Sequence, residues 1–264
     1  MTSALAASNA GVRIAYELRG AGSPLLLVQG LGYPRWGWEP VVDGLAERFL
    51  VCLYDNRGIG ESDVPAGPYT VPQLAGDALA VLDAAGIEQA HVVGTSLGGM
   101  VAQELALTYP DRVERLVLVC TTPGVRGVPM PEQTVRLMAE APSLAPDVAL
   151  RRFVENALAP GAPAELVDEI TRRRLESPPD PAGWAAQAGA AMSFDALDRL
   201  GELSAPTLVL HGTEDAVVDP ANADLLAAGI PGARLELFEG CGHLFMWEQP
   251  DRFVRVVTGF LEAE

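Results

Sequence analysis

The sequence predicts an α/β fold in which a mostly parallel sheet is covered by helices on both faces. Short apolar runs alternate with amphipathic segments along most of the chain, which is the pattern of that class. The chain has 264 residues, 49% of them hydrophobic, so it can bury a sizeable core in one unit. The alternation is interrupted between residues 123 and 204, where helical segments follow one another.

Seven short runs have the length and composition of strands. The first alternates apolar and polar residues, and the others are nearly continuous apolar runs, as expected of strands buried on both faces. The predicted strands are residues 11–18, 24–28, 50–54, 90–93, 115–120, 207–210 and 235–238.

Apolar residues at helical spacing occur between these strands. Residues 69–82 have this spacing, and Thr70 is predicted as the N-cap of that helix. A helical stretch at residues 100–107 follows the strand at 90–93, and the last helix is predicted from residue 250 to about residue 261.

Residues 123–204 are predicted to form a helical cap inserted into a core of residues 1–122 and 205–264. Helices are expected near residues 132–140, 146–158, 164–175 and 181–192. Ligands of open α/β sheets bind outside the carboxyl ends of the strands, where such an insertion packs. Most apolar cap residues are expected to pack the cap onto the core. Trp184 and Phe194 are the first candidates for lining the substrate pocket.

Residues 94–98 read Gly-Thr-Ser-Leu-Gly and lie between a predicted strand and a predicted helix. This is a Gly-x-Ser-x-Gly pattern, in which the glycines let strand and helix approach around a strained serine. The bare pattern also fits a glycine-rich turn before an ordinary helix. Its strand-turn-helix setting favours Ser96 as a nucleophile, with the Leu97 amide at a helix end that stabilises an oxyanion.

A serine needs a base, and the base needs an orienting group. Asp215 lies in a loop just after the strand at 207–210, and His243 follows the strand at 235–238. The order serine, aspartate, histidine along the chain is that of the α/β-hydrolase triad. These three residues are therefore the catalytic candidates.

Other residues near the triad candidates are expected to be structural. Asp219 directly precedes Pro220 and is predicted as the N-cap of the next helix. His91, at the start of a strand, is expected to be a packing or surface residue, and His211, at a strand end, to be structural.

These features together resemble the α/β-hydrolase superfamily. Residues 55–62 are similar to its D-x-R-G-x-G-x-S signature, in which Asp55 and Arg57 are expected to fix loops. The core most resembles carboxylesterases and 3-oxoadipate enol-lactonases. The resemblance implies a serine hydrolase that cleaves a carboxylic ester or lactone through an acyl-enzyme intermediate on Ser96.

The resemblance also implies the second donor of the oxyanion hole. Relatives commonly have His-Gly-x where this chain has Gln29, Gly30 and Leu31. The Leu31 amide is then expected to join the Leu97 amide as a donor. Gly30 is expected to supply an unusual backbone shape and to border the substrate. Gln29 departs from the family but can still hydrogen-bond to fix the loop.

Several other reactions on this fold stay open. Cofactor-free haloperoxidases or perhydrolases and C–C bond hydrolases keep the serine, so the triad does not exclude them. Epoxide hydrolases, haloalkane dehalogenases and dienelactone hydrolases have another residue at the position of Ser96 and are disfavoured. An alternative outside the enzymes is a ligand receptor on the same fold with slow residual hydrolysis.

The charge and cysteine content of the chain limit which molecules it is expected to bind. The 18 Lys and Arg residues against 35 Asp and Glu residues give a formal charge of -17, which disfavours nucleic acid and anionic membranes. The 3 cysteines are expected to be reduced thiols. No metal-ligand spacing and no complete dinucleotide fingerprint is found, so no metal and no cofactor is expected.

Neither a signal-peptide pattern nor an apolar run of membrane-spanning length is found, which predicts a cytoplasmic location. The expected partner is a small-molecule ester or lactone. A homo-oligomer is left open.

Overall fold

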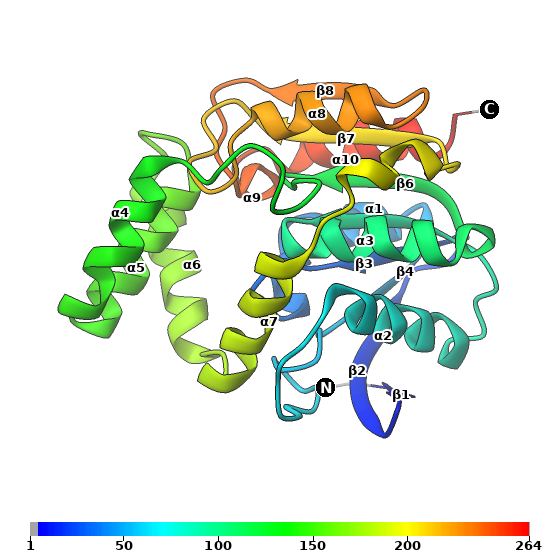
Figure 1. Cartoon of the computed structure of the whole chain (residues 1–264), viewed down its shortest axis with the longest axis horizontal. Coiled ribbons are helices and arrows are strands. Elements are labelled where there is room, and N and C mark those ends of the chain that lie inside the picture. The colour runs from blue at the N-terminus through cyan, green and yellow to red at the C-terminus, as the bar shows by residue number, and fades with distance from the viewer. Residues whose placement is uncertain (1–4, 264) are drawn as a thin grey trace.

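The structure, a computed structural model, describes residues 5–263. Residues 1–4, which are part of the segment examined for a signal-peptide pattern, lie outside this range. An eight-stranded sheet with the order β1-β2-β4-β3-β5-β6-β7-β8 runs through the molecule (Figure 1). β2 pairs antiparallel with both β1 and β4. The other neighbouring pairs, β4–β3, β3–β5, β5–β6, β6–β7 and β7–β8, are parallel. The predicted mostly parallel α/β fold is confirmed.

The seven predicted strands are all present, each within two residues of its predicted limits. The strands are β1 (Leu5–Asn9), β2 (Val12–Arg19), β3 (Ser23–Val28), β4 (Phe49–Tyr54), β5 (Ala90–Thr95), β6 (Val113–Val119), β7 (Thr207–Gly212) and β8 (Arg234–Phe238). β1 was not predicted, because this edge strand consists of small and polar residues without a clear period.

Helices cover both faces of the sheet, as the sequence predicts (Figure 1). One face packs against α2 (Val71–Ala84), α3 (Leu97–Thr108) and α8 (Ala221–Gly229). The other packs against α1 (Glu39–Ala46), the short α9 (Phe245–Glu248) and α10 (Pro250–Leu261). Thr70 caps α2 as predicted: its hydroxyl accepts from the Gln73 amide, and the Gln73 side chain accepts from the Thr70 amide.

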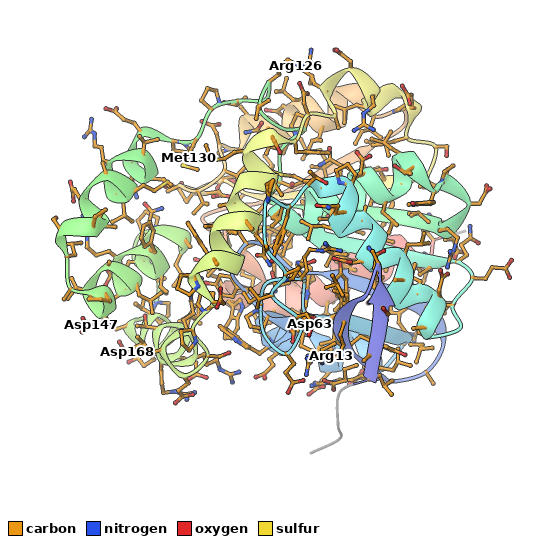
Figure 2. The ribbon with its side chains drawn as sticks, turned by 60° about the horizontal axis from the view of Figure 1, so that its bottom comes forward. Arg13, Asp63, Arg126, Met130, Asp147 and Asp168 are labelled. Carbon is orange, nitrogen blue, oxygen red and sulfur yellow. The ribbon has the colours of Figure 1, made fainter. Side chains whose placement is uncertain are left out.

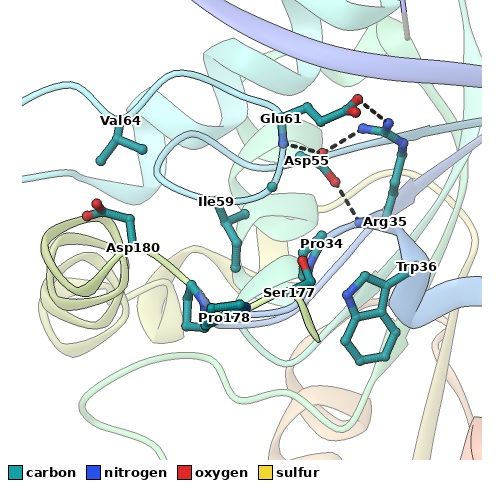
Figure 3. Close-up of a pocket in the computed structure, with 12 residues that line it drawn as sticks. Pro34, Arg35, Trp36, Asp55, Ile59, Glu61, Val64, Ser177, Pro178 and Asp180 are labelled. Carbon is teal, nitrogen blue, oxygen red and sulfur yellow. Dashed lines mark hydrogen bonds and ion pairs between the residues drawn. The ribbon is translucent and has the colours of Figure 1, made fainter. Parts of the chain in front are cut away.

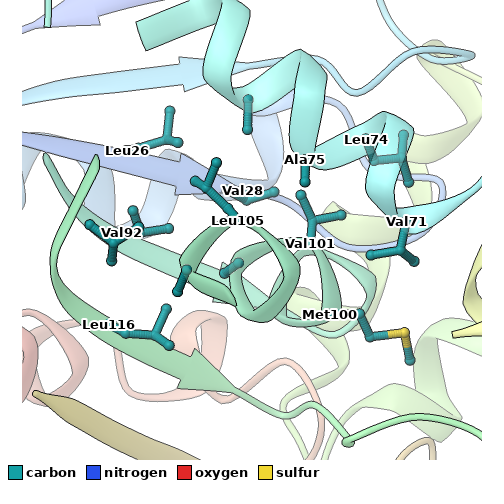
Figure 4. Packing of buried hydrophobic residues seen from close by; sticks show 14 of the residues in the cluster. Leu26, Val28, Val71, Leu74, Ala75, Val92, Met100, Val101, Leu105 and Leu116 are labelled. Atoms are coloured by element: carbon teal, nitrogen blue, oxygen red, sulfur yellow. The ribbon is translucent and has the colours of Figure 1, made fainter. Parts of the chain in front are cut away.

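The core between the sheet and α3 supports the strand end at which Ser96 lies. Figure 4 shows Val28 and Val92 of two adjacent strands facing Val101 and Leu105 of α3. All four side chains are fully buried. Truncating a buried leucine to alanine costs about 2 to 5 kcal/mol, so this packing stabilises the strand end at which Ser96 lies.

Four helices form the insertion between β6 and β7. They are α4 (Glu132–Glu140), α5 (Pro146–Ala157), α6 (Ala164–Glu176) and α7 (Pro181–Ser193). Their outer surface is charged, with Asp147 and Asp168 pointing into solvent (Figure 2). Their inner side packs Val154 and Ile170 against Leu244, the residue after His243. No helix in residues 5–263 is long and apolar enough to cross a membrane.

The signature after β4 fixes loops, as expected. Asp55 accepts hydrogen bonds from the Arg35 and Glu61 amides and from the Arg35 side chain (Figure 3). Arg57 makes two hydrogen bonds of 2.6 Å to Asp77 on α2, and both side chains are buried. The Arg57–Asp77 pair ties the loop after β4 to the core helix α2.

Asp77→Ala is expected to lower the free energy of unfolding by about 3 to 5 kcal/mol, because it leaves the Arg57 charge buried without its partner. Asp83→Ala breaks the pair with Arg112, in which the Asp83 side chain is 60% exposed, and is expected to cost at most about 1 kcal/mol. Denaturant unfolding of both variants measures the difference. Equal losses would show that the buried pair contributes no more than a surface pair.

Candidate active site

Ser96 lies at a sharp turn between β5 and α3. Its φ of 55° and ψ of -119° are outside the regions that most side-chain-bearing residues adopt, a strain of order 1 to 3 kcal/mol that the surrounding structure must hold. A Cβ on Gly94 would collide with the Gly98 backbone, and a Cβ on Gly98 would collide with the Val28 carbonyl. The spacing of the two glycines is therefore required by space, and the turn presents the serine hydroxyl.

The strand order brings the predicted triad to one edge of the sheet. Ser96 follows β5, Asp215 follows β7 and His243 follows β8, and these strands are parallel members of one sheet. Cys120, at the end of the intervening β6, donates its amide to Leu210 of β7. The carboxyl ends of parallel strands are where ligands of this fold class bind.

Asp215 and His243 are in direct contact. His243 Nδ1 donates to Asp215 Oδ2 over 2.7 Å, and Oδ1 accepts from the Val217 and Val218 amides. Burial alone would raise the pKa of Asp215, but the charge of His243 and the hydrogen bonds with His211 and His243 outweigh it and hold the pKa well below its ordinary value. Asp215 is thus an ionised, fixed acceptor that leaves His243 Nε2 free to act as a base.

Ser96 Oγ and His243 Nε2 are not hydrogen-bonded to one another within 3.5 Å in the described part of the chain. Neither atom has a hydrogen-bond partner among residues 5–263. Since neither is among the fully buried polar atoms that lack a partner, both retain some exposure to solvent. Catalytic hydrogen bonds are often long without substrate and shorten in the complex. The structure thus joins Asp215 to His243 and brings Ser96 to the same ends of the parallel strands.

The amides of Leu31 and Leu97 have no hydrogen-bond acceptor among residues 5–263, which leaves both able to bind an oxyanion. Gly30 lies against Ser96: a Cβ there would be 3.1 Å from Ser96 Cβ. The reason expected for this glycine was wrong. The left-handed backbone is at Gly32, with φ 73°, and at Gly30 the space for a Cβ is tight.

The residue that departs from the family, Gln29, does fix the loop. Its Oε1 accepts from the Gly30 amide over 2.8 Å, and its carbonyl accepts from Asn56 Nδ2 over 2.9 Å. The loop is also tied to the cap, because the fully buried Gln187 of α7 accepts from the Gly32 amide and donates to the Arg57 carbonyl. Nothing in the sequence distinguishes Gln187, because its role depends on how α7 packs.

The two predicted pocket residues lie in different surroundings. Trp184 is 36% exposed and contacts Gly32, where a Cβ would be 2.8 Å from its indole Cδ1. Phe194 is 4% exposed and belongs to the main hydrophobic core, and its carbonyl accepts from the Val125 amide. Trp184 therefore borders the loop of residues 29–32, which carries the Leu31 amide and is called the candidate oxyanion loop. The role of Phe194 in substrate binding stays a prediction.

Arg174 is a residue near the candidate oxyanion loop that the sequence did not reveal. Its guanidinium lies 4.4 Å over the Tyr33 ring, its Nη2 is 3.5 Å from where a Cβ on Gly32 would be, and its Nε is buried without a partner. No carboxylate lies within 4.0 Å of it in the described residues, whereas the cap arginines Arg126 and Arg151 both have acidic partners. A run of three arginines does not show which one the helix turns inward.

Cys120, His211 and Asp215 form a buried group whose ligand atoms lie within 4.8 Å of one another. Burial raises the pKa of the Cys120 thiol well above its ordinary value, so the thiol is protonated. The Asp215 oxygens are already engaged by histidine and backbone donors. The donor set fits a hydrogen-bonded support for the acid better than a metal site.

A cavity of about 560 Å³ lies apart from the triad, between the loops after β3 and β4 and the α6–α7 connection (Figure 3). Trp36, Ile59 and Pro178 contribute to its walls, and no triad residue does. The one cation in its wall, Arg35, is paired with Asp55 and Glu61.

Comparisons with known proteins agree on the fold. Residues 23–250 match the family model described as alpha/beta hydrolase fold. The putative carbamate hydrolase RutD of Azorhizobium caulinodans is 34% identical over 254 residues, which cover 93% of each chain. The 2-hydroxy-6-oxo-6-phenylhexa-2,4-dienoate hydrolase of Comamonas testosteroni is 31% identical, covering 94% of this chain and 91% of that one.

The solved structure of the enol-lactonase from Burkholderia xenovorans LB400 is also similar. It superposes with a TM-score of 0.86 at 30% identity, covering 98% of this chain and 100% of that one. By their names, these relatives are all hydrolases, and their substrates differ.

Proposed function

This chain belongs to the α/β-hydrolase fold family and is a hydrolase, and we propose on that premise that it cleaves carboxylic esters or lactones through an acyl-enzyme intermediate. The observation that carries the proposal is the buried 2.7 Å hydrogen bond between His243 Nδ1 and Asp215 Oδ2, at the sheet edge where the strained turn presents Ser96. An oriented base beside an exposed hydroxyl is the requirement of nucleophilic acyl transfer.

In the proposed reaction Ser96 Oγ attacks the carbonyl carbon while His243 Nε2 takes its proton. The oxyanion receives hydrogen bonds from the Leu31 and Leu97 amides, and one such donor is worth about 10² to 10³ in kcat. The intermediate collapses, and the leaving alcohol takes the proton from His243. Water then attacks the acyl-enzyme with His243 again as base, which releases the acid and restores Ser96.

The cap is proposed to select the substrate. Residues 123–204 lie between β6 and β7, and their helix α7 is joined to the candidate oxyanion loop through Gln187 and Trp184. Trp184 then limits the size of the group beside the carbonyl. A change of one methylene in an apolar pocket is worth about 1 to 3 kcal/mol, which is the range over which the cap can discriminate.

Steady-state and stopped-flow assays with p-nitrophenyl esters and a lactone series test the function. We expect turnover of both substrate classes and a burst of p-nitrophenol equal to the enzyme concentration wherever deacylation limits. Saturable lactone binding with no turnover of any ester would favour the receptor alternative. Oxidation that depends on peroxide with no hydrolysis would favour the haloperoxidase alternative.

A second candidate substrate is one that carries a carboxylate, either an acidic ester or lactone or the substrate of a C–C bond hydrolase. Arg174 favours it, because its guanidinium lacks a carboxylate partner and lies beside the candidate oxyanion loop in a chain whose formal charge is -17. The Comamonas testosteroni relative is, by its name, a dienoate hydrolase.

Arg174→Gln is expected to raise KM for mono-p-nitrophenyl glutarate about 10- to 100-fold, because a hydrogen bond to a charged group is worth about 1.5 to 3 kcal/mol. The neutral ester p-nitrophenyl pentanoate is expected to change less than about 3-fold. Arg172→Gln, which removes an exposed arginine paired with Glu169 and Glu176, is the matched control. Equal effects on the acidic and the neutral ester would contradict carboxylate recognition by Arg174.

A further inference from the structure

His211 of β7 is a second histidine in contact with the proposed catalytic acid. It is fully buried, and its Nε2 lies 3.0 Å from Asp215 Oδ2, the same oxygen that accepts from His243 Nδ1. The same Nε2 is 3.0 Å from the Val218 carbonyl oxygen, and Nδ1 is buried without a partner. The proposed mechanism uses only one of these two histidines.

The surroundings of His211 determine its tautomer. A carboxylate oxygen and a carbonyl oxygen both accept hydrogen bonds, so an unprotonated Nε2 between Asp215 and Val218 would face lone pairs on both sides. Nε2 therefore carries the proton, which it donates to the Val218 carbonyl oxygen while Asp215 Oδ2 lies 3.0 Å away. Nδ1 has no hydrogen-bond partner among residues 5–263, so it is the nitrogen without the proton in this tautomer.

We infer that His211 is a positioning residue that acts on His243 through Asp215, because its Nε2–H lies against the oxygen that binds His243 and thereby limits how strongly His243 holds its proton. The inference rests on the proposed function, in which His243 is the base. It adds a second imidazole to the Asp–His pair and assigns it no contact with substrate.

The geometry separates this role from simple support of the loop. Asp215 Oδ1 is held by the Val217 and Val218 amides, so the carboxylate keeps its place when His211 is changed. What changes is the charge on Oδ2, which burial keeps away from compensating water. Without the N–H group 3.0 Å away, Oδ2 stabilises the His243 imidazolium more, and we expect His243 to take up its proton at a higher pH.

Two other titratable groups face Asp215. The Cys120 thiol is one of them, and burial keeps its pKa so high that it stays neutral. Glu248 of α9 is the other; burial raises its pKa, while the Ala159 and Gly242 amides donate to it and oppose the rise. Both groups are the same in the wild type and in the variants of His211, so a difference between these proteins reports on His211.

The test is an NMR titration of His243 in ¹⁵N-histidine-labelled protein, together with the pH profile of kcat/KM for p-nitrophenyl butyrate. His211→Gln places an amide donor where Nε2 lies, whereas the shorter side chain of His211→Asn reaches only the level of Nδ1. In His211→Asn we expect the His243 titration and the acidic limb of the profile to move up together by about 0.5 to 1 pH unit, and in His211→Gln by less than about 0.2. His91→Gln, at a buried histidine outside the site, is the control.

Two results overturn the inference: an unshifted His243 titration in His211→Asn, or equal shifts in His211→Asn and His211→Gln. If the variants fail to fold, the ¹⁵N spectrum of the wild type still tests the premise of the inference, because an Nδ1–H tautomer at His211 contradicts it. The NMR readouts do not depend on turnover. Absence of ester hydrolysis with the expected His243 shift would therefore refute the proposed substrate and leave the role of His211 standing.

Discussion

Ser96→Ala is expected to abolish ester hydrolysis, with a loss of about 10⁵ to 10⁶ in kcat, because the triad acts as a unit and the base has no nucleophile left to activate. Residual activity comes only from the oxyanion donors and substrate binding. The fold is expected to survive, since Ser96 Oγ has no hydrogen-bond partner in the described structure and the turn is held by its glycines. Single-turnover kinetics with p-nitrophenyl butyrate measures the loss.

Ser143→Ala is the control, because Ser143 is exposed on the cap and bonds only the Glu140 carbonyl. It should retain the activity of the wild type. Ester hydrolysis within tenfold of the wild type in Ser96→Ala, with an unchanged unfolding transition, would remove Ser96 as the nucleophile.

Asp215→Asn is expected to lower kcat about 10⁴-fold, by analogy with the serine-protease triad. The asparagine oxygen can still accept from the Val217 and Val218 amides, so its NH₂ group then faces His243 Nδ1. That contact favours the tautomer with the proton on Nε2, which cannot accept the proton of Ser96.

Asp219→Asn is the matched control in the same loop. The N-cap of α8 is Pro220 and not the predicted Asp219, but Asp219 still accepts from the Ala221 amide. An asparagine oxygen can accept from the same amide, so Asp219→Asn should change stability little and leave kcat nearly unchanged. Comparison of kcat and thermal unfolding for the two variants separates the roles. A larger kcat loss in Asp219→Asn than in Asp215→Asn would make Asp219 the acid.

The strands and helices that the sequence predicted are those whose burial leaves a periodic pattern. Buried parallel strands are continuous apolar runs, and α10 (Pro250–Leu261) has an apolar stripe with its start marked by proline, so its predicted limits match. β1 and α1 were missed. β1 pairs only at the sheet edge, and α1 (Glu39–Ala46) directly continues a short 3₁₀ segment without a side-chain cap.

In the candidate site, too, the residues placed by local sequence patterns could be predicted, and those placed by packing between distant segments could not. Ser96, Asp215 and His243 could be proposed because each follows a strand end, and strand ends of a parallel sheet meet at one edge. The roles of Arg174 and Gln187 depend on how the cap helices rotate against the core, which no local pattern encodes. His211 could be placed at a strand end, but its contact with Asp215 depends on the path of the loop that follows.

The central claim is that the chain forms a covalent intermediate on Ser96, and mass spectrometry after reaction with a fluorophosphonate tests it most directly. The reagent mimics the tetrahedral intermediate, so it reacts only where a base activates the nucleophile and amides stabilise the oxyanion. The account predicts one adduct per chain, on the peptide that contains Ser96, with the rate of labelling lowered in Asp215→Asn. An adduct on any other residue, or ester turnover in a protein that the reagent does not label, would contradict it.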